Sequence, residues 1–221
     1  MSSVEKSPQG TADRPQSGPE ELVNAISHGL GALLGVAGLV VLVVLAALHG
    51  DAWQVVASSI YGSTLVLLYL SSTLYHAFRG QRVKRVFQAF DHAGIFLLIA
   101  GTYTPFTLVT IRGPWGWTLF GVIWGLGIAG AVLEVVFLDR FPRLSLAFYL
   151  AMGWAVVAAI VPLVRAMTPA GLVWLVAGGI AYTAGTLFYR MGHRRFMHGI
   201  WHLFVLAGSV CHWFAVLAEI G

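Results

Sequence analysis

The last apolar segment of the chain carries two histidines at a spacing that suits metal binding. His198 and His202, in the run 198-HGIWHLFVLAGSVCH-212, are four residues apart. A helix therefore places both imidazoles on one face, one turn apart. An imidazole is costly in an apolar helix unless something binds it, and a metal ion is the commonest partner of a histidine pair at this spacing. A third ligand at the same depth would complete a site.

Other apolar segments bring polar side chains to this depth. His76 ends the second segment, and Ser72 lies one helical turn before it on the same face. The third segment begins at the same end, and we expect Asp91 in its first turn. The first segment also begins there, with three further polar residues, Glu21, Asn24 and His28. Polar and charged groups inside membrane-spanning segments are expensive and usually mark function, so their convergence predicts a site.

Three neutral imidazoles, those of His76, His198 and His202, predict a zinc site of the catalytic kind. Zinc with three protein ligands keeps a fourth position open for water and lowers the pKa of that water to about 7. Asp91 would accept the proton of this water or orient it, as a general base. Ser72 would either fix His76 or hold an oxyanion, and the sequence leaves both roles open. Another divalent ion also stays open, because imidazoles suit several.

The spacing of His198 and His202 equals that of the HExxH helix of metalloproteases. Gly199 stands where that motif has its glutamate base. A base must therefore come from another helix, and Asp91 is the natural candidate.

The composition is that of an integral membrane protein. Of the 221 residues, 58% are hydrophobic and only 10% are charged, and the mean hydropathy is +0.80. A soluble globular domain rarely has this balance. The net charge of +4 does not indicate nucleic-acid binding, because the basic residues lie in the expected loops. The single cysteine, Cys211, excludes an intramolecular disulfide.

The hydropathy pattern predicts an all-α bundle of seven transmembrane helices. Residues 1–20 are polar and rich in Ser, Pro and Gly, which predicts a disordered cytoplasmic tail before a transmembrane domain of residues 21–221. Each apolar segment is near the ~20 residues that a bilayer requires. Short connectors make sequential helices antiparallel neighbours. The seven segments are residues 22–50, 53–76, 91–111, 115–138, 144–164, 171–189 and 196–218.

Basic residues predict the orientation. Nine lie in the loops after the second, fourth and sixth helices: Arg79, Arg82, Lys84, Arg85, Arg140, Arg143, Arg190, Arg194 and Arg195. The opposite loops carry only Arg112 and Arg165, whereas the tail adds Lys6 and Arg14 to the rich side. The positive-inside rule then gives a cytoplasmic N-terminus and an external C-terminus in the inner cell membrane, with the site near the cytoplasmic face.

Four segments together resemble a known family: 21-ELVNAISH-28, 72-STLYH-76, 91-DHAGIFLLIAGTYTPF-106 and 198-HGIWHLFVLAGSVCH-212. They are similar to the hemolysin III proteins, the bacterial branch of the progestin and adipoQ receptor family, which includes the adiponectin receptors. The resemblance covers roughly residues 20–220. It implies seven helices with a cytoplasmic N-terminus, and zinc held by the three histidines with Asp91 and Ser72 beside the bound water.

The resemblance also implies a class of activity. The wider superfamily is one of membrane hydrolases acting on lipid amides or esters, the adiponectin receptors are similar to ceramidases, and bacterial members are linked to membrane-lipid homeostasis. The leading hypothesis is therefore a zinc-dependent lipid amidase or esterase whose substrate enters from the bilayer. Two alternatives remain: a non-enzymatic membrane sensor or receptor with structural zinc, and the channel or cytolysin that the name hemolysin implies.

The sequence leaves the roles of several other polar residues open. His212 lies about 15 Å beyond His202 along a straight helix, so it cannot bind the same ion. We expect His212 to be a hydrogen-bonded structural residue or to face a substrate cavity. His28 either supports the site or makes packing contacts. Glu134 is expected to pair with an arginine of the next loop, and Glu21 to cap the first helix or to pair with the basic loops.

Overall fold

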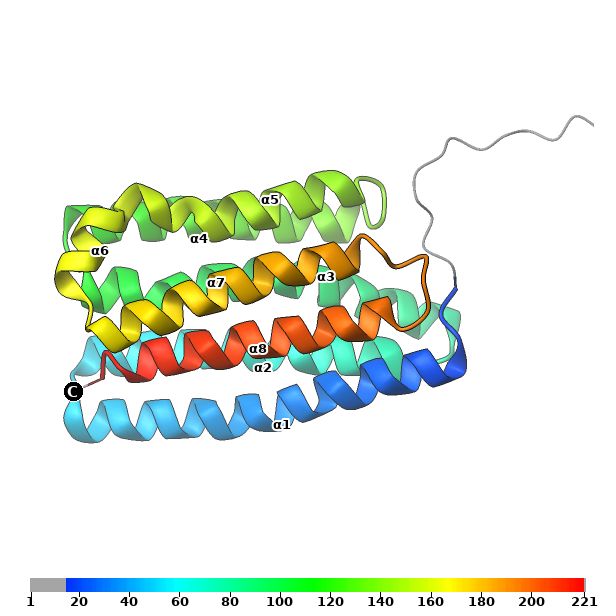
Figure 1. Cartoon of the computed structure of the whole chain (residues 1–221), viewed down its shortest axis with the longest axis horizontal. Coiled ribbons are helices and arrows are strands. Elements are labelled where there is room, and N and C mark those ends of the chain that lie inside the picture. Colours follow the sequence, from blue (N-terminus) through cyan, green and yellow to red (C-terminus); the bar gives the residue numbers. More distant parts are fainter. Residues whose placement is uncertain (1–14, 221) are drawn as a thin grey trace, which may run out of the picture.

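A computed structural model of the chain describes residues 15–220 and is built of helices (Figure 1). Within residues 15–220, seven helical segments are long and apolar enough to span a membrane, which confirms the predicted number. Most of the predicted tail lies outside the described residues, and residues 18–20 belong to the first helix. The elements are α1 (Gly18–His49), α2 (Ala52–Ala77), α3 (Gln81–Pro105) with η1 (Phe106–Thr110), α4 (Pro114–Val136), α5 (Pro142–Trp154) with η2 (Ala155–Ala159) and α6 (Ile160–Ala166), α7 (Pro169–Tyr189) and α8 (Met197–Leu217).

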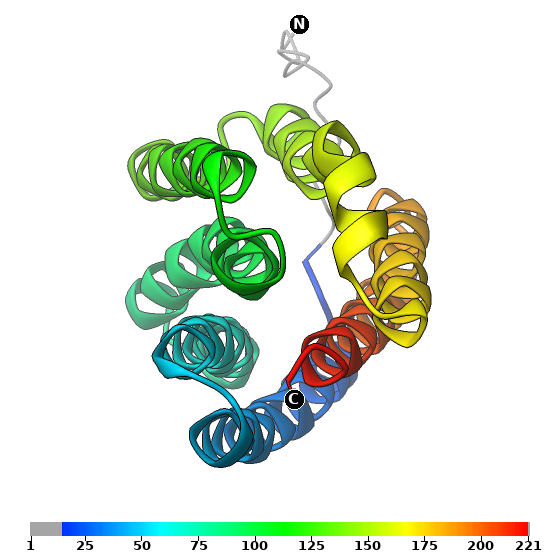
Figure 2. The same cartoon turned by 90° about the vertical axis from the view of Figure 1, so that its left-hand side faces the viewer.

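The spans form a ring in chain order when they are viewed along their length (Figure 2). Each helix packs against its neighbour in the sequence, and α8 closes the ring by packing against α1. Because the number of spans is odd, the beginning of α1 and the end of α8 lie at opposite ends of the bundle (Figure 1). Ring closure places the first, second and last helices side by side at the end where α1 begins.

Helix α3 begins ten residues before the predicted start at Asp91. Its first turns carry basic residues, whose long side chains allow the charged ends to stay in water while the helix continues. Lys84 in these turns bonds with Glu21 of α1, so the early turns are part of the packed structure. Asp91 consequently lies about 15 Å from the start of α3 rather than in its first turn. It still lies next to Ser72, because α2 and α3 run antiparallel.

Small residues bring α1 and α2 close together. A Cβ atom added at Gly31 would lie 2.6 Å from the ring of Tyr69, and one added at Gly35 would lie 2.9 Å from a methyl group of Leu65. Glycine lets two helix backbones approach to this distance without a clash. This close approach brings the polar side chains of α1 within hydrogen-bonding reach of α2.

The fifth span is the least regular part of the ring. Helix α5 ends at Trp154, and a 3₁₀ turn separates it from α6. The Tyr103 hydroxyl of α3 occupies this break: it lies 2.8 Å and 2.9 Å from the carbonyl oxygens of Met152 and Gly153 as donor, and it accepts from the Val156 amide at 2.7 Å. A side chain of the neighbouring helix thus satisfies backbone groups that the interrupted helix leaves open.

Candidate metal centre

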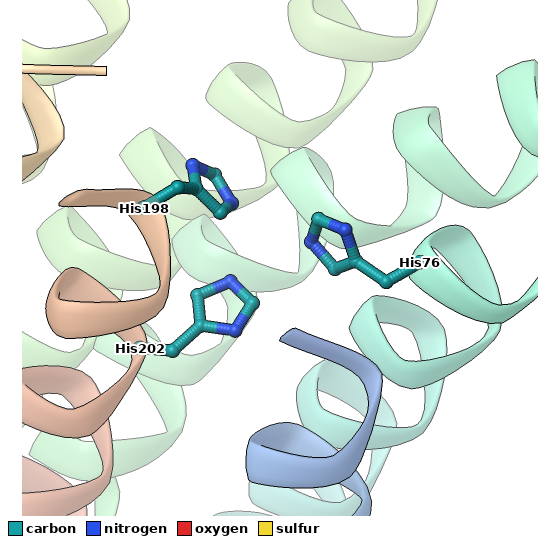
Figure 3. Close-up of side chains that lie close together, drawn as sticks. All are labelled: His76, His198 and His202. Atoms are coloured by element: carbon teal, nitrogen blue, oxygen red, sulfur yellow. The ribbon is translucent and has the colours of Figure 1, made fainter. Parts of the chain in front are cut away.

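Three imidazoles from two helices converge at the end of the bundle where α1 begins (Figure 3). His76 comes from the last turns of α2, and His198 and His202 come from the first turns of α8. Their ligand atoms all lie within 4.8 Å of one another, and the ring centroids are 4.7–5.2 Å apart. The predicted convergence is therefore confirmed, and the three side chains could hold a metal ion.

The unpartnered atoms of these rings fit a metal. The Nε2 atoms of His76, His198 and His202 are buried and have no hydrogen-bond partner within the described part of the chain. Leaving a buried polar atom unpaired costs about 1–3 kcal/mol. Three such atoms facing one point would all be satisfied by a single cation with nitrogen ligands.

Hydrogen bonds at the opposite ring nitrogens fix the lone pairs of two of these imidazoles. The Nδ1 atom of His76 donates to a carboxylate oxygen of Glu21 at 2.7 Å. The Nδ1 atom of His202 lies 3.3 Å from the Ser27 hydroxyl, whose proton is donated to the Asn24 carbonyl oxygen. Nδ1 is therefore the protonated nitrogen in both rings, and Nε2 carries the lone pair that a metal needs.

Glu21 is the charged partner that positions the ligand His76. Its second carboxylate oxygen accepts from the Lys84 ammonium at 2.6 Å, so α1, α2 and α3 meet at this carboxylate. A carboxylate behind a ligating histidine orients the ring and raises its basicity. The expected pairing of Glu21 with the basic region is confirmed, but sequence reasoning missed its contact with His76. The helical spacing could have indicated this contact, because Glu21 lies on the same face of α1 as Asn24 and His28.

The start of α8 is attached to α1. Phe196 precedes the helix in a left-handed conformation, with φ of 60°, and its amide donates to a carboxylate oxygen of Glu20 at 2.8 Å. Gly199 follows in the first turn of α8, where an added Cβ atom would lie 3.1 Å from the Asn24 side-chain oxygen. The position that holds a glutamate in HExxH helices therefore packs against α1. A base at this position would meet α1 and not the centre.

Ser72, Asp91 and His28 form a buried group beside the three imidazoles. The Ser72 hydroxyl lies 2.7 Å from Nδ1 of His28 and next to the Asp91 carboxyl. One role left open for Ser72 was to fix the ring of His76. The structure shows no hydrogen bond between these two side chains, because Nδ1 of His76 bonds with Glu21 instead. The His28 ring stacks on His202 with a centroid distance of 3.5 Å. His28 therefore belongs to the surroundings of the site.

Glu134 does not pair with Arg140 or Arg143, as the sequence had indicated. It is buried, and its carboxylate lies 3.2 Å from Nδ1 of His92 and accepts from the Ser145 hydroxyl at 2.6 Å. The expectation failed because it assumed that Glu134 points outward to the loop. The rotation of α4 instead turns it inward, toward α3 and α5.

A cavity of about 260 Å³ extends from the centre into the bundle. Asp91, His28 and His198 line it at the metal end, and His212 lines it farther along α8. Most of the remaining lining is aliphatic or aromatic, including Leu68, Ile95, Leu98, Ile99, Leu150 and Val205. The arrangement joins a cluster of polar side chains to a largely apolar space.

Residues 17–213 match the family model described as haemolysin-III related, and this range contains every residue of the centre. The chain belongs to this family. It is 48% identical over 198 residues to "Hemolysin-3" of Bacillus cereus, covering 90% of each chain, and 45% identical to the "Hemolysin-3 homolog" of Bacillus subtilis (strain 168), covering 90% of this chain and 93% of the relative. It is 30% identical over 186 residues to the rice "Heptahelical transmembrane protein ADIPOR2", covering 69% and 76%. Family membership and seven apolar spans indicate a multi-pass membrane protein.

Proposed function

We propose that the chain is a zinc-dependent hydrolase that cleaves an amide or ester bond of a membrane lipid, with a role in membrane-lipid homeostasis. The observation that carries this proposal is the set of three buried, unpartnered imidazole nitrogens at the end of an apolar cavity. A zinc ion with three such ligands supplies a Lewis acid and a water molecule whose pKa is lowered to about 7.

The residues beside the three imidazoles have distinct roles in this proposal. Asp91 lines the cavity and takes the proton of the attacking water as general base. Ser72, which lies between Asp91 and His28, holds the carboxyl in place and would support an oxyanion. His76, His198 and His202 hold the ion, and Glu21 keeps the ring of His76 oriented toward it.

The apolar cavity supports a lipid as the substrate. Its lining suits an acyl chain, and several lining residues also face the outside of the bundle: Trp154, Val157 and Val176 are 45%, 54% and 53% exposed. The cavity therefore approaches the lipid-facing surface near α5 and α7. We propose that the lipid enters there directly from the bilayer, with no passage through water.

We place the centre on the cytoplasmic side of the inner cell membrane. The segments that carry nine of the basic residues lie at the same end of the bundle as the start of α1 and the three imidazoles (Figure 1). By the positive-inside rule this end faces the cytoplasm. The product head group would then be released on that side.

A channel is less well supported than a hydrolase. The name "Hemolysin-3" of the Bacillus cereus relative indicates cell lysis by that protein. A pore for ions needs polar lining throughout, whereas aliphatic side chains such as Leu98 and Ile99 line the middle of this cavity. A sensor with structural zinc would use the same ligands, and it differs from a hydrolase in having no need for a base at Asp91.

The deciding experiment is metal analysis and lipid hydrolysis on one set of purified proteins. We expect about one zinc per chain in the wild type, loss of zinc in His76→Ala, and full zinc in Asp91→Asn. Hydrolysis of lipid amides or esters should be absent in His76→Ala and lower by about a hundredfold or more in Asp91→Asn. Glu134→Gln, which alters another carboxylate of the cavity lining, is the matched control and should remain active.

Each alternative predicts a different result. An Asp91→Asn protein with full zinc and unchanged function would support the sensor over the hydrolase. Wild-type protein that is prepared without chelators and contains no metal would remove the basis for the hydrolase. Ion conductance in proteoliposomes that contain only the purified chain would support the channel.

A further inference from the structure

His212 lies in the cavity at a distance from the metal centre. It is ten residues beyond His202 on the continuous helix α8, which corresponds to about 15 Å along the helix axis. Its side chain lines the same cavity as Asp91 and His198, and the residue is only 7% exposed. The cavity therefore contains a histidine well separated from the three imidazoles, and the proposed function gives this histidine no role.

Only one of the two ring nitrogens of His212 forms a hydrogen bond with the backbone. Nδ1 lies 2.8 Å from the Gly208 carbonyl oxygen. A carbonyl oxygen only accepts hydrogen bonds, so Nδ1 carries the proton and Nε2 carries a lone pair. Among the described residues, this bond at Nδ1 is the only hydrogen bond of the imidazole. His212 thus offers the cavity one hydrogen-bond acceptor.

The imidazole of His212 is held in this orientation by α7. A Cβ atom added at Gly178 would lie 2.3 Å from Nδ1, so the absence of a side chain there makes room for the ring. One helical turn later on α7, the ring of Tyr182 stacks on the imidazole with a centroid distance of 5.2 Å. The acceptor is therefore in a fixed position, as expected for a residue that recognises a ligand group.

The neighbouring hydroxyl groups do not satisfy His212, because they converge on Ser209. The Tyr69 and Tyr182 hydroxyls lie 2.8 Å from the Ser209 hydroxyl, and the Tyr61 hydroxyl donates to the Ser209 carbonyl oxygen at 3.3 Å. This group connects α2, α7 and α8 in the interior. Its hydrogen bonds are made within the protein, so the acceptor on His212 remains for a molecule in the cavity.

Further hydroxyl groups of the cavity lining also donate their hydrogen bonds within the protein. They donate to backbone carbonyl oxygens and come from Thr102, Tyr103, Thr107, Thr183 and Thr186. The protons of these hydroxyls are therefore not donated to Nε2 of His212, which can accept a hydrogen bond from a ligand group that carries a proton. A neutral donor fits better than a cation, since the surroundings are apolar.

We propose that His212 binds a hydroxyl or amide N–H group in the chain of an elongated amphiphile whose head lies at the three imidazoles. The position of the head rests on the proposed function. A distance of about 15 Å corresponds to about twelve carbons of an extended chain, because each C–C bond of about 1.5 Å advances less than its full length. His212 would then select lipids with a polar group at this depth over unsubstituted acyl chains.

The test measures binding without turnover. Purified protein in nanodiscs competes for labelled octadecanoate against three probes: octadecanoate, octadecanoate hydroxylated about twelve carbons from its carboxyl carbon, and an isomer hydroxylated close to the carboxyl group. We expect the wild type to bind the distal isomer about fivefold more tightly than octadecanoate, as one additional buried hydrogen bond provides. The proximal isomer should show no gain.

Two variants test whether His212 causes the preference for the distal isomer. His212→Phe keeps a stacking ring but lacks the acceptor, and Gly178→Ala displaces the imidazole. Both should lower the preference to below about twofold. Tyr61→Phe is the matched control, since it removes a hydroxyl of the Ser209 group that does not line the cavity, and it should keep the preference.

The outcomes separate this proposal from the proposed function. An equal affinity of the wild type for the three probes, or an unchanged preference in a correctly folded His212→Phe or Gly178→Ala protein, would overturn the role of His212. A chain that shows the distal preference but contains no metal and hydrolyses no lipid would retain the role of His212 and refute the hydrolase. Empty nanodiscs correct for partitioning of the probes into the bilayer.

Discussion

Two walls of the bundle differ in how tightly they are packed. The first wall consists of α1, α2 and α3, and the second consists of α5 and α6 with η2. In the most apolar stretches of α2 and α3 with η1, 50% and 72% of the residues are buried, against 11% in the span of α5 and α6. The first wall holds Ser72, His76 and Asp91, and the second supplies mainly apolar lining of the cavity. The comparison indicates that the polar groups of the candidate site are held by many fixed neighbours, whereas the span of α5 and α6 has few.

The two walls are also held by different interactions. Close backbone packing and buried hydrogen bonds join α1 to α2, as Gly31 and the bond between His28 and Ser72 show. Helix α5 is tied to its neighbours by a few polar contacts, including those of Tyr103 and Ser145. Loss of one contact should therefore have large effects in the first wall and small effects in the second.

The largest effect is expected for His202→Ala, which removes the α8 ligand that faces the first wall. Removing one of three ligands should lower the zinc content from about one per chain to near zero, together with any hydrolysis. Trp154→Phe in the opposite wall, which removes a hydrogen bond to Thr183, should retain full zinc. Mass spectrometry measures the zinc content of both variants. Full zinc in His202→Ala would contradict the assignment of ligands.

The second-largest effect is expected on the zinc affinity of the Glu21→Gln variant. Replacing the carboxylate behind His76 should weaken zinc affinity by about 10- to 100-fold without removing the site, because the three ligands remain. The affinity is measured by competition with a chromophoric chelator. An unchanged affinity would show that Glu21 only anchors Lys84 and does not tune the ligand.

The third prediction compares one added methyl group in the two walls. Gly31→Ala should lower the free energy of unfolding by about 1–3 kcal/mol, since the new Cβ atom meets the Tyr69 ring. Gly153→Ala in α5 should change it by no more than about 1 kcal/mol and in the stabilising direction, since its Cβ atom meets nothing within 4 Å. Denaturation in detergent micelles measures both, and equal effects would refute the contrast between the walls.

The smallest effect is expected for Ser145→Ala. This change removes the hydrogen bond that ties the start of α5 to Glu134, and should cost about 1 kcal/mol or less because His92 still contacts the carboxylate. Zinc affinity should stay unchanged. A change in zinc affinity would show that the two walls are coupled more strongly than their packing indicates.

Hydropathy and helical spacing were sufficient to predict the spans and the convergence of the histidines. Each span is a long apolar run, and the positions of His198 and His202 follow from one helical turn. The short connectors then placed His76 at the same end. These features depend on local sequence and on bilayer thickness, which the sequence contains directly.

Features that depend on how helices rotate against one another could not be predicted. The inward turn of Glu134 toward His92 depends on the contact between α3 and α4, and no local pattern marks it. The early start of α3 was missed because basic residues in its first turns look like a loop when only hydropathy is considered. The contact between Glu21 and His76 also needed the packing of α1 against α2.

The bond between Glu20 and the amide of Phe196 has a consequence for biosynthesis. Helices enter the membrane in the order in which the ribosome makes them, so His76 is in place long before His198 and His202. The metal centre is therefore completed only when the last helix docks against the first. If the site binds zinc as proposed, the ion can bind only at this last step. A chain that terminates before residue 198 should then be inserted but contain no bound zinc, which metal analysis of such a truncated protein can test.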